Sequence, residues 1–139
     1  MQTTDQTNVI TATQVPEGQR LGTLPRYFGA KLTRAEMLVY DWMGALCRDY
    51  SGGYWDFYAL SNGGFYMAPA YEGRLKVSVD GNGFSAEMTA NGAGLVAVLF
   101  ALCQLANETE EDHFIELYRQ VRDYVAFHPE ARLIYRAID

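Results

Sequence analysis

The chain has 139 residues, of which 49% are hydrophobic and 14% aromatic, and this composition excludes an intrinsically disordered protein. Its length fits a single domain that can bury a core without disulfides or metals. The formal net charge of −6, from 17 acidic and 11 basic side chains, disfavours nonspecific attraction to nucleic acid or to an anionic membrane.

The N-terminal residues differ in composition from the rest of the chain. Residues 1–14 are rich in Thr and Gln and carry few apolar anchors, so we expect a disordered tail followed by a single domain over residues 15–139. The tail has no basic stretch of the kind that opens a secretory signal, and a cytoplasmic location is therefore expected.

Two helical segments are predicted before the first strand. Apolar residues between 21 and 28 fit a short helical turn whose length is limited by Pro25. Thr33 and Glu36 have the spacing of a capping box, which predicts a helix start. Apolar residues at helical spacing then continue that helix to about Tyr50.

Residues 54–67 predict a β-hairpin, because aromatic residues flank a Ser-Asn-Gly-Gly turn sequence. The Asn-Gly pair suits the centre of a two-residue type I′ turn, which would pair Phe57 with Ala68 and Ala59 with Tyr66. Both faces of this hairpin are then largely apolar or aromatic. The pattern predicts either a sheet that is covered on both sides or one that presents a tyrosine-rich face to a partner.

A second hairpin follows in the sequence. Apolar residues alternate with polar ones over 75–79 and again over 84–88. An Asn-Gly turn at 82–83 would pair Val79 with Ala86 and would place the apolar residues of both strands on one face. The two hairpins together predict one four-stranded antiparallel sheet.

Three further helical segments complete the predicted fold. Residues 95–103 are entirely apolar, which is typical of a buried central helix, and they are too few to cross a bilayer. The small Gly94 would allow a neighbouring element to approach this helix closely. Thr109 and the acids after it cap an amphipathic helix that ends at His128, and a short helix follows Pro129. The predicted class is α+β: a four-stranded antiparallel sheet packed with three main helices and a short C-terminal helix.

Residues with metal-binding or nucleophilic potential are few. Cys47 and Cys103 lie in apolar helical patterns and are expected to be buried thiols. His113 and His128 have no Cys or His at ligand spacing nearby. Neither a metal site nor a cofactor is therefore predicted.

Asp56 is the acid with the most unusual surroundings, because it lies between Trp55 and Phe57. Burial among aromatic rings would favour its uncharged form, as in some active sites, whereas exposure or a hydrogen bond to a tyrosine would give it a structural role. One carboxylate does not form an acid-base pair, and the sequence indicates no second acid opposite it. The chain is not expected to be an enzyme, and a site around Asp56 and its tyrosines is kept as the alternative.

The acidic residues are too scattered to imitate DNA. A mimic needs a dense row of carboxylates, because duplex DNA carries one charge per about 1.7 Å of its axis. The densest acidic group lies between Glu108 and Glu116, at the start of a predicted helix, where carboxylates stabilise the helix dipole. DNA mimicry is therefore disfavoured.

Several short motifs, in this order, resemble the ArdB/KlcA family of plasmid-encoded antirestriction proteins. The motifs are Leu-Pro-Arg-Tyr-Phe-Gly at 24–29, Val-Tyr-Asp-Trp-Met at 39–43, the aromatic hairpin at 52–66, Asn-Gly-Phe at 82–84, Ala-Gly at 93–94, His-Pro-Glu-Ala at 128–131 and Ile-Tyr-Arg-Ala-Ile-Asp at 134–139. The resemblance covers nearly all of the chain outside the expected tail.

The resemblance implies a protein that protects incoming unmodified DNA by countering the host's type I restriction-modification enzyme, or a host factor on which that enzyme depends. It implies action by binding, without catalysis, a cofactor, DNA mimicry, direct nucleic-acid binding or a membrane. The polar residues inside the matching motifs are the candidate partner contacts: Arg26, Asp41, Asp56, Asn62, Glu130, Arg136 and Asp139.

Overall fold

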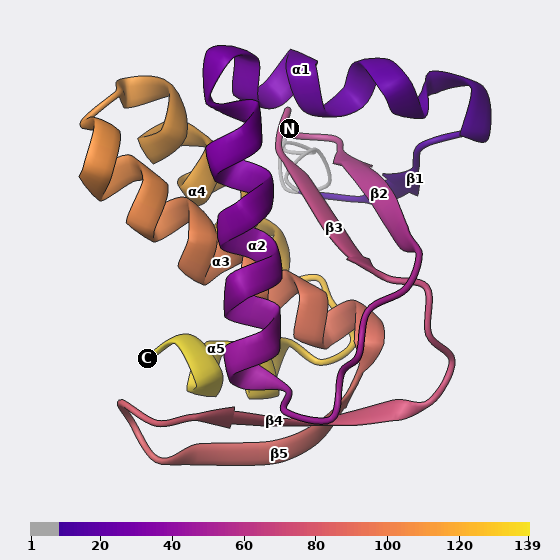
Figure 1. The fold of residues 1–139 in the computed structure, drawn as a ribbon, viewed down its shortest axis with the longest axis vertical. Helices are drawn as coiled ribbons and strands as arrows, with labels where there is room; N and C mark the ends of the chain where they lie inside the picture. The colour runs from indigo at the N-terminus through magenta and orange to yellow at the C-terminus, as the bar shows by residue number, and fades with distance from the viewer. Residues whose placement is uncertain (1–8) are drawn as a thin grey trace, which may run out of the picture.

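The structure is a computed structural model that describes residues 9–139, and its fold is α+β, as predicted (Figure 1). The elements in chain order are β1 (Ala12–Gln14), the 3-10 helix η2 (Glu17–Gly22), α1 (Thr23–Phe28), the 3-10 turn η3 (Gly29–Lys31), α2 (Leu32–Leu46), β2 (Trp55–Leu60), β3 (Phe65–Pro69), β4 (Arg74–Val79), β5 (Phe84–Thr89), α3 (Ala90–Thr109), α4 (Asp112–Val125) and α5 (Ala131–Ile138). The strands form two antiparallel sheets, β1-β2-β3 and β4-β5. The predicted helices are confirmed, although α2 ends at Leu46 and not near Tyr50. The single four-stranded sheet is wrong.

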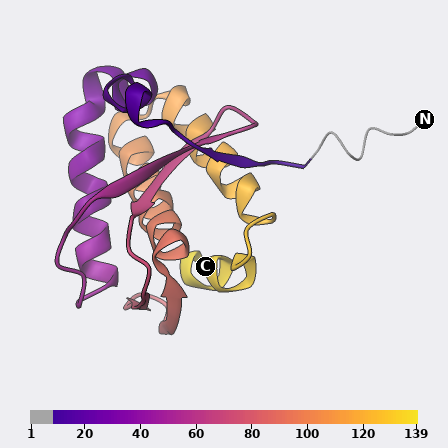
Figure 2. The same ribbon diagram turned by 90° about the vertical axis from the view of Figure 1, so that its right-hand side faces the viewer.

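The three-stranded sheet lies between two layers of helices (Figures 1 and 2). On one face, Phe65 of β3 packs against Tyr27 and Phe28 of α1, with ring centroids 4.7 and 6.0 Å apart. On the other face, Tyr66 stacks on Tyr124 of α4 with centroids 5.7 Å apart. β3 is therefore covered on both sides, as the first alternative from the sequence has it, whereas β1 at the edge of the sheet is largely exposed.

The central helix is α3, as predicted. Residues 95–99 are each no more than 1% exposed. Gly94 lies so close to β3 that a Cβ atom there would come within 2.5 Å of the Cα of Ala68, which confirms the predicted close approach. Among the described residues, α3 is the helix that is long and apolar enough to cross a membrane, with 20 residues and a mean hydropathy of 1.5, but 67% of that stretch is buried inside the fold.

The β4-β5 ribbon covers one end of the molecule, below α2 and α5 in Figure 1. Its apolar face points inward, and Val77 and Met88 are completely buried. The opposite face carries the polar residues of both strands. The ribbon stays separate from the other sheet because the chain leaves β3 at Pro69 and turns away through an exposed loop at 70–73.

The first hairpin has a different turn from the predicted one. Leu60 donates to Gly64 O at 2.9 Å and Gly63 donates to Leu60 O at 3.0 Å, so the loop is Ser61-Asn62-Gly63 and only Gly63 has a positive φ, 94°. This loop shifts the register by one residue, pairing Tyr58 with Tyr66 instead of Ala59 with Tyr66. The predicted register is wrong, and the aromatic residues that share a face are correspondingly exchanged.

The second hairpin also departs from its predicted register, but without exchanging its faces. Val79 pairs with Phe84 rather than Ala86, because the loop contains Asp80 to Gly83 and closes through Gly83 N to Val79 O at 3.1 Å. The shift is two residues, which preserves the side-chain alternation. The apolar residues therefore still lie together on the inner face.

Three smaller predictions need correction. The expected tail is too long, since Ala12–Gln14 forms β1; residues 1–8 of it lie outside the described residues. The capping box at Thr33 does not form, because η3 leads directly into α2, which starts at Leu32 without a side-chain cap. Cys47 is buried as expected, whereas Cys103 lies on an exposed edge of α3.

Candidate contact site

A polar hollow forms where β1 passes into η2 and both lie beside β2. Pro16, with φ −63° and ψ 152°, ends β1 and starts η2, so the 3-10 helix turns back over the strand. The hollow has a volume of about 380 Å³ and is lined by Gln14, Val15, Pro16, Glu17, Arg20, Tyr54 and Asp56. It contains Asp56, one of the seven candidates from the sequence.

Arg20 is held in this hollow by two aromatic rings. Its Cζ atom lies 4.4 Å from the centroid of Tyr54 and 4.2 Å from that of Phe57. Such contacts fix a guanidinium plane without using its N–H donors. No hydrogen bond or ion pair joins the Arg20 guanidinium to another of the residues 9–139.

The two carboxylates nearest to Arg20 are each held by another donor. Tyr54 Oη donates to Glu17 Oε1 at 2.9 Å, and this hydrogen bond raises the pKa of Tyr54. Gln14 Nε2 donates to Asp56 Oδ1 at 3.2 Å. Neither Glu17 nor Asp56 forms a hydrogen bond or ion pair with the Arg20 guanidinium. Asp56 is thus hydrogen-bonded, but to Gln14 and not to a tyrosine, the partner considered from the sequence.

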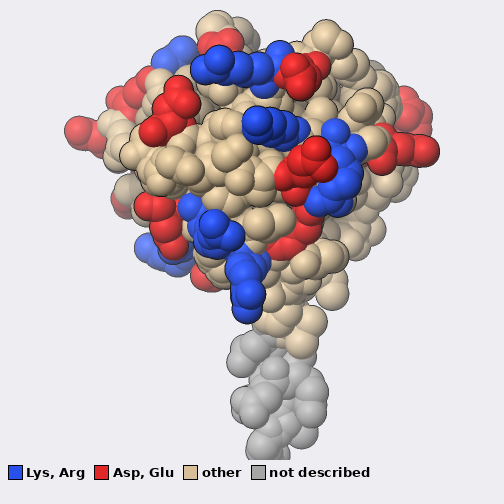
Figure 3. Space-filling view, turned by 90° about the horizontal axis from the view of Figure 1, so that it is seen from below, with Lys and Arg blue, Asp and Glu red and all other residues tan. Residues whose placement is uncertain are grey.

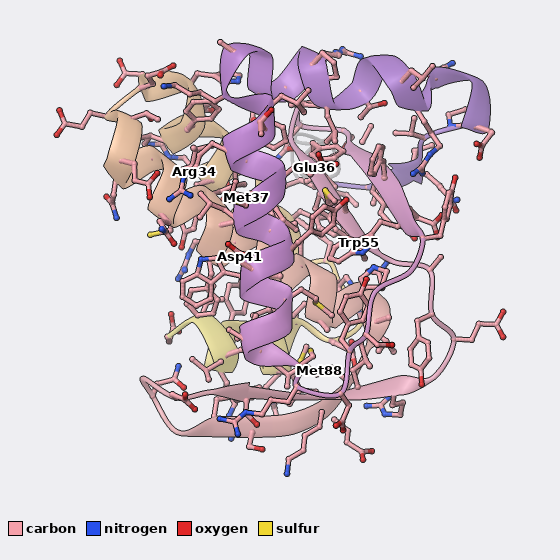
Figure 4. All side chains as sticks on the ribbon, viewed as in Figure 1. Arg34, Glu36, Met37, Asp41, Trp55 and Met88 are labelled. Atoms are coloured by element: carbon pink, nitrogen blue, oxygen red, sulfur yellow. The ribbon has the colours of Figure 1, made fainter. Side chains whose placement is uncertain are left out.

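Aromatic side chains extend this site toward α2. Tyr40 packs edge-on against Trp55 with centroids 5.3 Å apart and donates to Glu36 Oε2 at 3.3 Å. Burial, together with the negative charge of Glu36, raises the pKa of Tyr40 to about 12. In Figure 4, Glu36 and Trp55 lie on the same side of α2. We call the surface formed by Glu17, Arg20, Tyr40, Tyr54 and Asp56 the Arg20 surface.

The Arg20 surface has the composition of a protein contact. Tyr54 is 53% exposed, and Leu21, next to Arg20 in η2, is 97% exposed. Tyrosine and arginine are enriched where proteins bind one another, because both bury large areas and offer directed hydrogen bonds. The arrangement can therefore recognise a partner through aromatic contact and one oriented cation.

The other side of α2 carries a polar network that is already satisfied. Arg34 donates to both carboxylate oxygens of Glu108 at 2.9 and 2.6 Å, and Gln104 also donates to Glu108, at 3.0 Å. These hydrogen bonds lower the pKa of Glu108 to about 2. Trp42 stacks on Phe100 at 4.7 Å and donates to Gln104 at 2.9 Å. This network joins α2 to α3 and leaves few unpaired groups.

Two of the seven candidates have structural roles. Asn62 donates to Gln120 O at 2.9 Å and accepts from Gly64 N at 3.0 Å, which ties the β2-β3 loop to α4. The Glu130 side chain is only 12% exposed and accepts from Thr89 N and, at 2.6 Å, from Thr89 Oγ1. Glu130 thus holds the start of α5 against the start of α3.

The remaining candidates are dispersed. Arg26 is exposed on α1 and lies 5.7 Å from the ring centroid of Tyr27. Asp41 is exposed on the side of α2 that carries Arg34 (Figure 4). Arg136 lies 5.6 Å from the Phe84 ring, and Asp139 pairs with Arg122 at 3.7 Å. The structure brings none of these four residues into the Arg20 surface.

Sequence analysis missed Arg20. Its ring partners lie in β2, far along the chain, and no short motif spans the two segments. The only signal was that Tyr54 and Phe57 flank the predicted Asp56. The stacking of Arg20 on the two rings depends on how η2 crosses β2. The spacing of residues within either segment does not predict this crossing.

Charges of both signs are mixed on the face of the molecule that Figure 3 shows. Figure 3, which shows the face formed by β4 and β5, has Lys and Arg side chains interspersed with Asp and Glu. Glu108 and Glu116 are each paired with an arginine, at 2.6 Å in both cases. Within residues 9–139, no group of three or more His, Cys, Asp or Glu side chains is placed to hold a metal ion.

The chain is similar to known antirestriction proteins. The family described as "Antirestriction protein" matches residues 48–139. Antirestriction protein KlcA of Escherichia coli is 52% identical, with 94% of both chains covered. The uncharacterized protein YafX of Escherichia coli strain K12 is 40% identical over 94% of this chain and 88% of its own.

A solved structure is similar over nearly the whole fold. Its TM-score is 0.88 and its sequence identity 54%, covering 94% of this chain and 95% of that chain. That work describes the KlcA and ArdB proteins as having a novel fold and antirestriction activity against type I DNA restriction systems in vivo but not in vitro.

Proposed function

Because the chain belongs to the ArdB/KlcA family of antirestriction proteins, we propose that it relieves type I restriction of unmodified DNA entering a cell, by binding a protein component through the Arg20 surface. The action takes place in the cytoplasm, where restriction enzymes meet incoming DNA. It requires contact alone and no chemistry of the chain itself.

The observation that carries the binding mode is the state of Arg20. A guanidinium oriented by two rings, with no hydrogen-bond acceptor among the described residues, is set up to receive an acceptor from another molecule. The exposed Leu21 and Tyr54 beside it add apolar area that a partner can bury. These features support contact with a protein.

The charge distribution supports a mode other than DNA mimicry. Glu108 and Glu116 belong to the densest acidic stretch of the sequence, yet each is neutralised by an arginine. A DNA mimic instead requires unpaired carboxylates at the regular spacing of phosphates. Two of the five acids in this segment, Glu108 and Glu116, are therefore engaged in intramolecular ion pairs.

The behaviour described for the solved relative supports a target that is present in the cell. That protein is active in vivo but not in vitro, which favours a target or condition present in the cell and missing from a purified mixture. We therefore infer that the present chain binds either a cellular factor on which the restriction enzyme depends or a state of that enzyme formed only in cells.

The function is tested by plating unmodified phage on a restricting host that expresses the chain. Protection raises the efficiency of plating relative to a host without the chain, and premodified phage plates equally on both. If the chain leaves the plating of unmodified phage unchanged, the proposed function is wrong. Cleavage of DNA or of a restriction subunit by the purified chain would contradict action by binding alone.

The role of the Arg20 surface is tested with Arg20→Gln against Arg119→Gln. Both variants remove one guanidinium, but Arg119 is exposed on α4 and, within residues 9–139, pairs only with Glu116 in the preceding turn. We expect Arg20→Gln to lose protection while keeping wild-type circular dichroism and thermal stability within a few degrees, and Arg119→Gln to protect fully. Full protection by a folded Arg20→Gln would show that the contact lies elsewhere.

A further inference from the structure

Strand β1 forms the outer edge of the three-stranded sheet. The sheet order is β1-β2-β3, so among residues 9–139 β1 is paired on one side only. Figure 2 shows β1 crossing the outside of the fold, away from the helices that cover β3. Its second side is therefore available for a further strand.

The register identifies the backbone groups that face outward. Val15 N donates to Phe57 O at 2.8 Å and Ser61 N donates to Thr11 O at 2.9 Å, so Thr11, Thr13 and Val15 direct their amides and carbonyls toward β2. The alternation of an antiparallel ladder then turns the N–H and C=O groups of Ala12 and Gln14 away from β2. No backbone hydrogen bond joins these groups to another described element.

β1 is short, with three residues, and ends just before Pro16, but it carries no charged side chain that would block strand addition. Edge strands are commonly protected by lysine, proline or a bulge. Residues 9–14 read Val-Ile-Thr-Ala-Thr-Gln, with neither a charge nor a proline, and the ladder with β2 is regular. Thr11 and Thr13 are exposed and β-branched, which favours pairing with another strand.

The open edge is continuous with the Arg20 surface. Gln14 and Val15, at the end of β1, line the same hollow as Arg20. A segment lying along β1 therefore reaches the guanidinium without leaving the surface. Within residues 9–139 the Arg20 guanidinium has no hydrogen bond or ion pair, so a carboxylate of the added segment could bind it there.

We propose that the protein partner adds an extended segment as a fourth strand along β1 and places a carboxylate of that segment on Arg20. The inference rests on the proposed function and specifies the partner's chemistry: an unstructured or edge segment, free of proline, with an Asp or Glu near one end. Backbone hydrogen bonds to Ala12 and Gln14 supply affinity, and the carboxylate supplies specificity.

Two other occupants fit the geometry less well. Nucleic acid presents no row of alternating N–H and C=O groups, and the chain's net charge is −6. A second copy, paired antiparallel about Thr13, would place the uncharged Val9 and Ile10 beside the start of η2. A partner segment with an acidic residue satisfies both the edge and the guanidinium.

The test compares Ala12→Pro with Ala12→Ser in the full-length chain. Proline removes the outward N–H that the partner strand requires and leaves the bonds to β2 in place, whereas serine keeps the N–H. We expect Ala12→Pro to lower phage protection about tenfold and Ala12→Ser to keep it, since one strand hydrogen bond and its neighbour are lost. Persistent hydrogen-exchange protection of the Val15 and Ser61 amides shows that β1 still pairs with β2.

A second pair of variants covers the case in which proline disturbs β1 itself. Thr13→Lys adds an edge charge at an exposed side chain and is expected to lower protection, while Thr13→Val keeps a β-branched residue and full protection. Full protection by both Ala12→Pro and Thr13→Lys overturns the proposal while leaving the proposed function intact. Failure of the wild type to protect rejects the function itself.

The oligomeric state separates the two protein occupants. Light scattering on the purified wild type is expected to give a monomer, because the partner is a different protein. A wild-type dimer that Ala12→Pro converts to a monomer would mean that β1 pairs with a second copy, and this result would also overturn the proposal.

Discussion

Replacing Gly94 by alanine tests the contact on which the layered arrangement depends. The added Cβ would lie 2.5 Å from both Cα and Cβ of Ala68 and 2.8 Å from Met67 O, whereas ordinary contacts begin near 3.4 Å. These atoms belong to β3 and cannot rotate away, so α3 and the strand must separate by nearly an ångström. Overpacking of this kind costs about 3 kcal/mol. The higher helix propensity of alanine stabilises the protein by roughly 1 kcal/mol, so the net destabilisation is about 2 kcal/mol.

Gly44→Ala is the matched control. Gly44 is also inside a helix, α2, but no atom outside its own helix lies within 4 Å of an added Cβ. The same substitution should therefore stabilise the protein by about 1 kcal/mol. By thermal unfolding we expect the Tm of Gly94→Ala to fall by roughly 6–10 °C and that of Gly44→Ala to rise by roughly 3–5 °C. Equal shifts of one sign in both variants would refute the close approach of α3 to β3.

Three other predictions follow from buried groups and loop contacts. Burial lowers the pKa of His128 below its ordinary 6.5. Its contribution to the free energy of unfolding is therefore complete above pH 6.5 and is lost as the pH falls toward the folded-state pKa. Urea unfolding over this range should show the loss, and His128→Gln should reduce the dependence of the unfolding free energy on pH. Burial raises the pKa of the Cys47 thiol to about 11, so iodoacetamide near pH 8 should modify the exposed Cys103 and spare Cys47 until the protein unfolds, as read by mass spectrometry. Asn62→Ala should cost about 1–3 kcal/mol in urea unfolding because the Gln120 carbonyl and Gly64 amide lose their partner, whereas Asn107→Ala on the exposed edge of α3 should change stability by less than about 0.5 kcal/mol.

The helices were predictable because their signals are local. The buried residues of α4 are Phe114, Leu117, Val121, Tyr124 and Val125, the stripe expected from helical spacing. The apolar run at 95–103 likewise lies in the central α3. Where a helix starts was less predictable, because η3 brings the chain into α2 with helical backbone already formed and makes a cap at Thr33 unnecessary.

The hairpin turns were not predictable in detail because contacts outside each hairpin select them. In the first, the Asn62 side chain donates to the backbone carbonyl of Gln120 in α4, and the Gln120 side chain donates to the backbone carbonyl of Asn62. In the second, Asn82 donates to Ala137 O at 2.9 Å and so caps the end of α5. An isolated Asn-Gly pair favours a two-residue turn, but these asparagines bind helices that arrive later in the chain. A one-residue shift exchanged the faces of the first hairpin, while a two-residue shift preserved those of the second.

The division into two sheets also depends on distant packing. Both hairpins have edges that could pair in one meander, and nothing in the sequence between 69 and 74 forbids it. In the structure, α3 packs against β3 and also contacts β4 and β5, so the ribbon lies across the end of the helix instead of beside β3. Because α3 is apolar on all sides, it must be covered by several elements, and this requirement determines how the strands are divided between two sheets.

Motif residues and contact residues are selected by different physical requirements. Asn62 and Glu130 lie within the motifs that carry the family resemblance, yet each satisfies backbone or side-chain donors inside the fold. A motif match therefore marks residues that the fold itself requires as readily as residues that a partner touches. Contact residues are better recognised by what folding leaves unpaired, and Arg20, oriented between Tyr54 and Phe57 beside the open edge of β1, meets that criterion without belonging to any of the motifs.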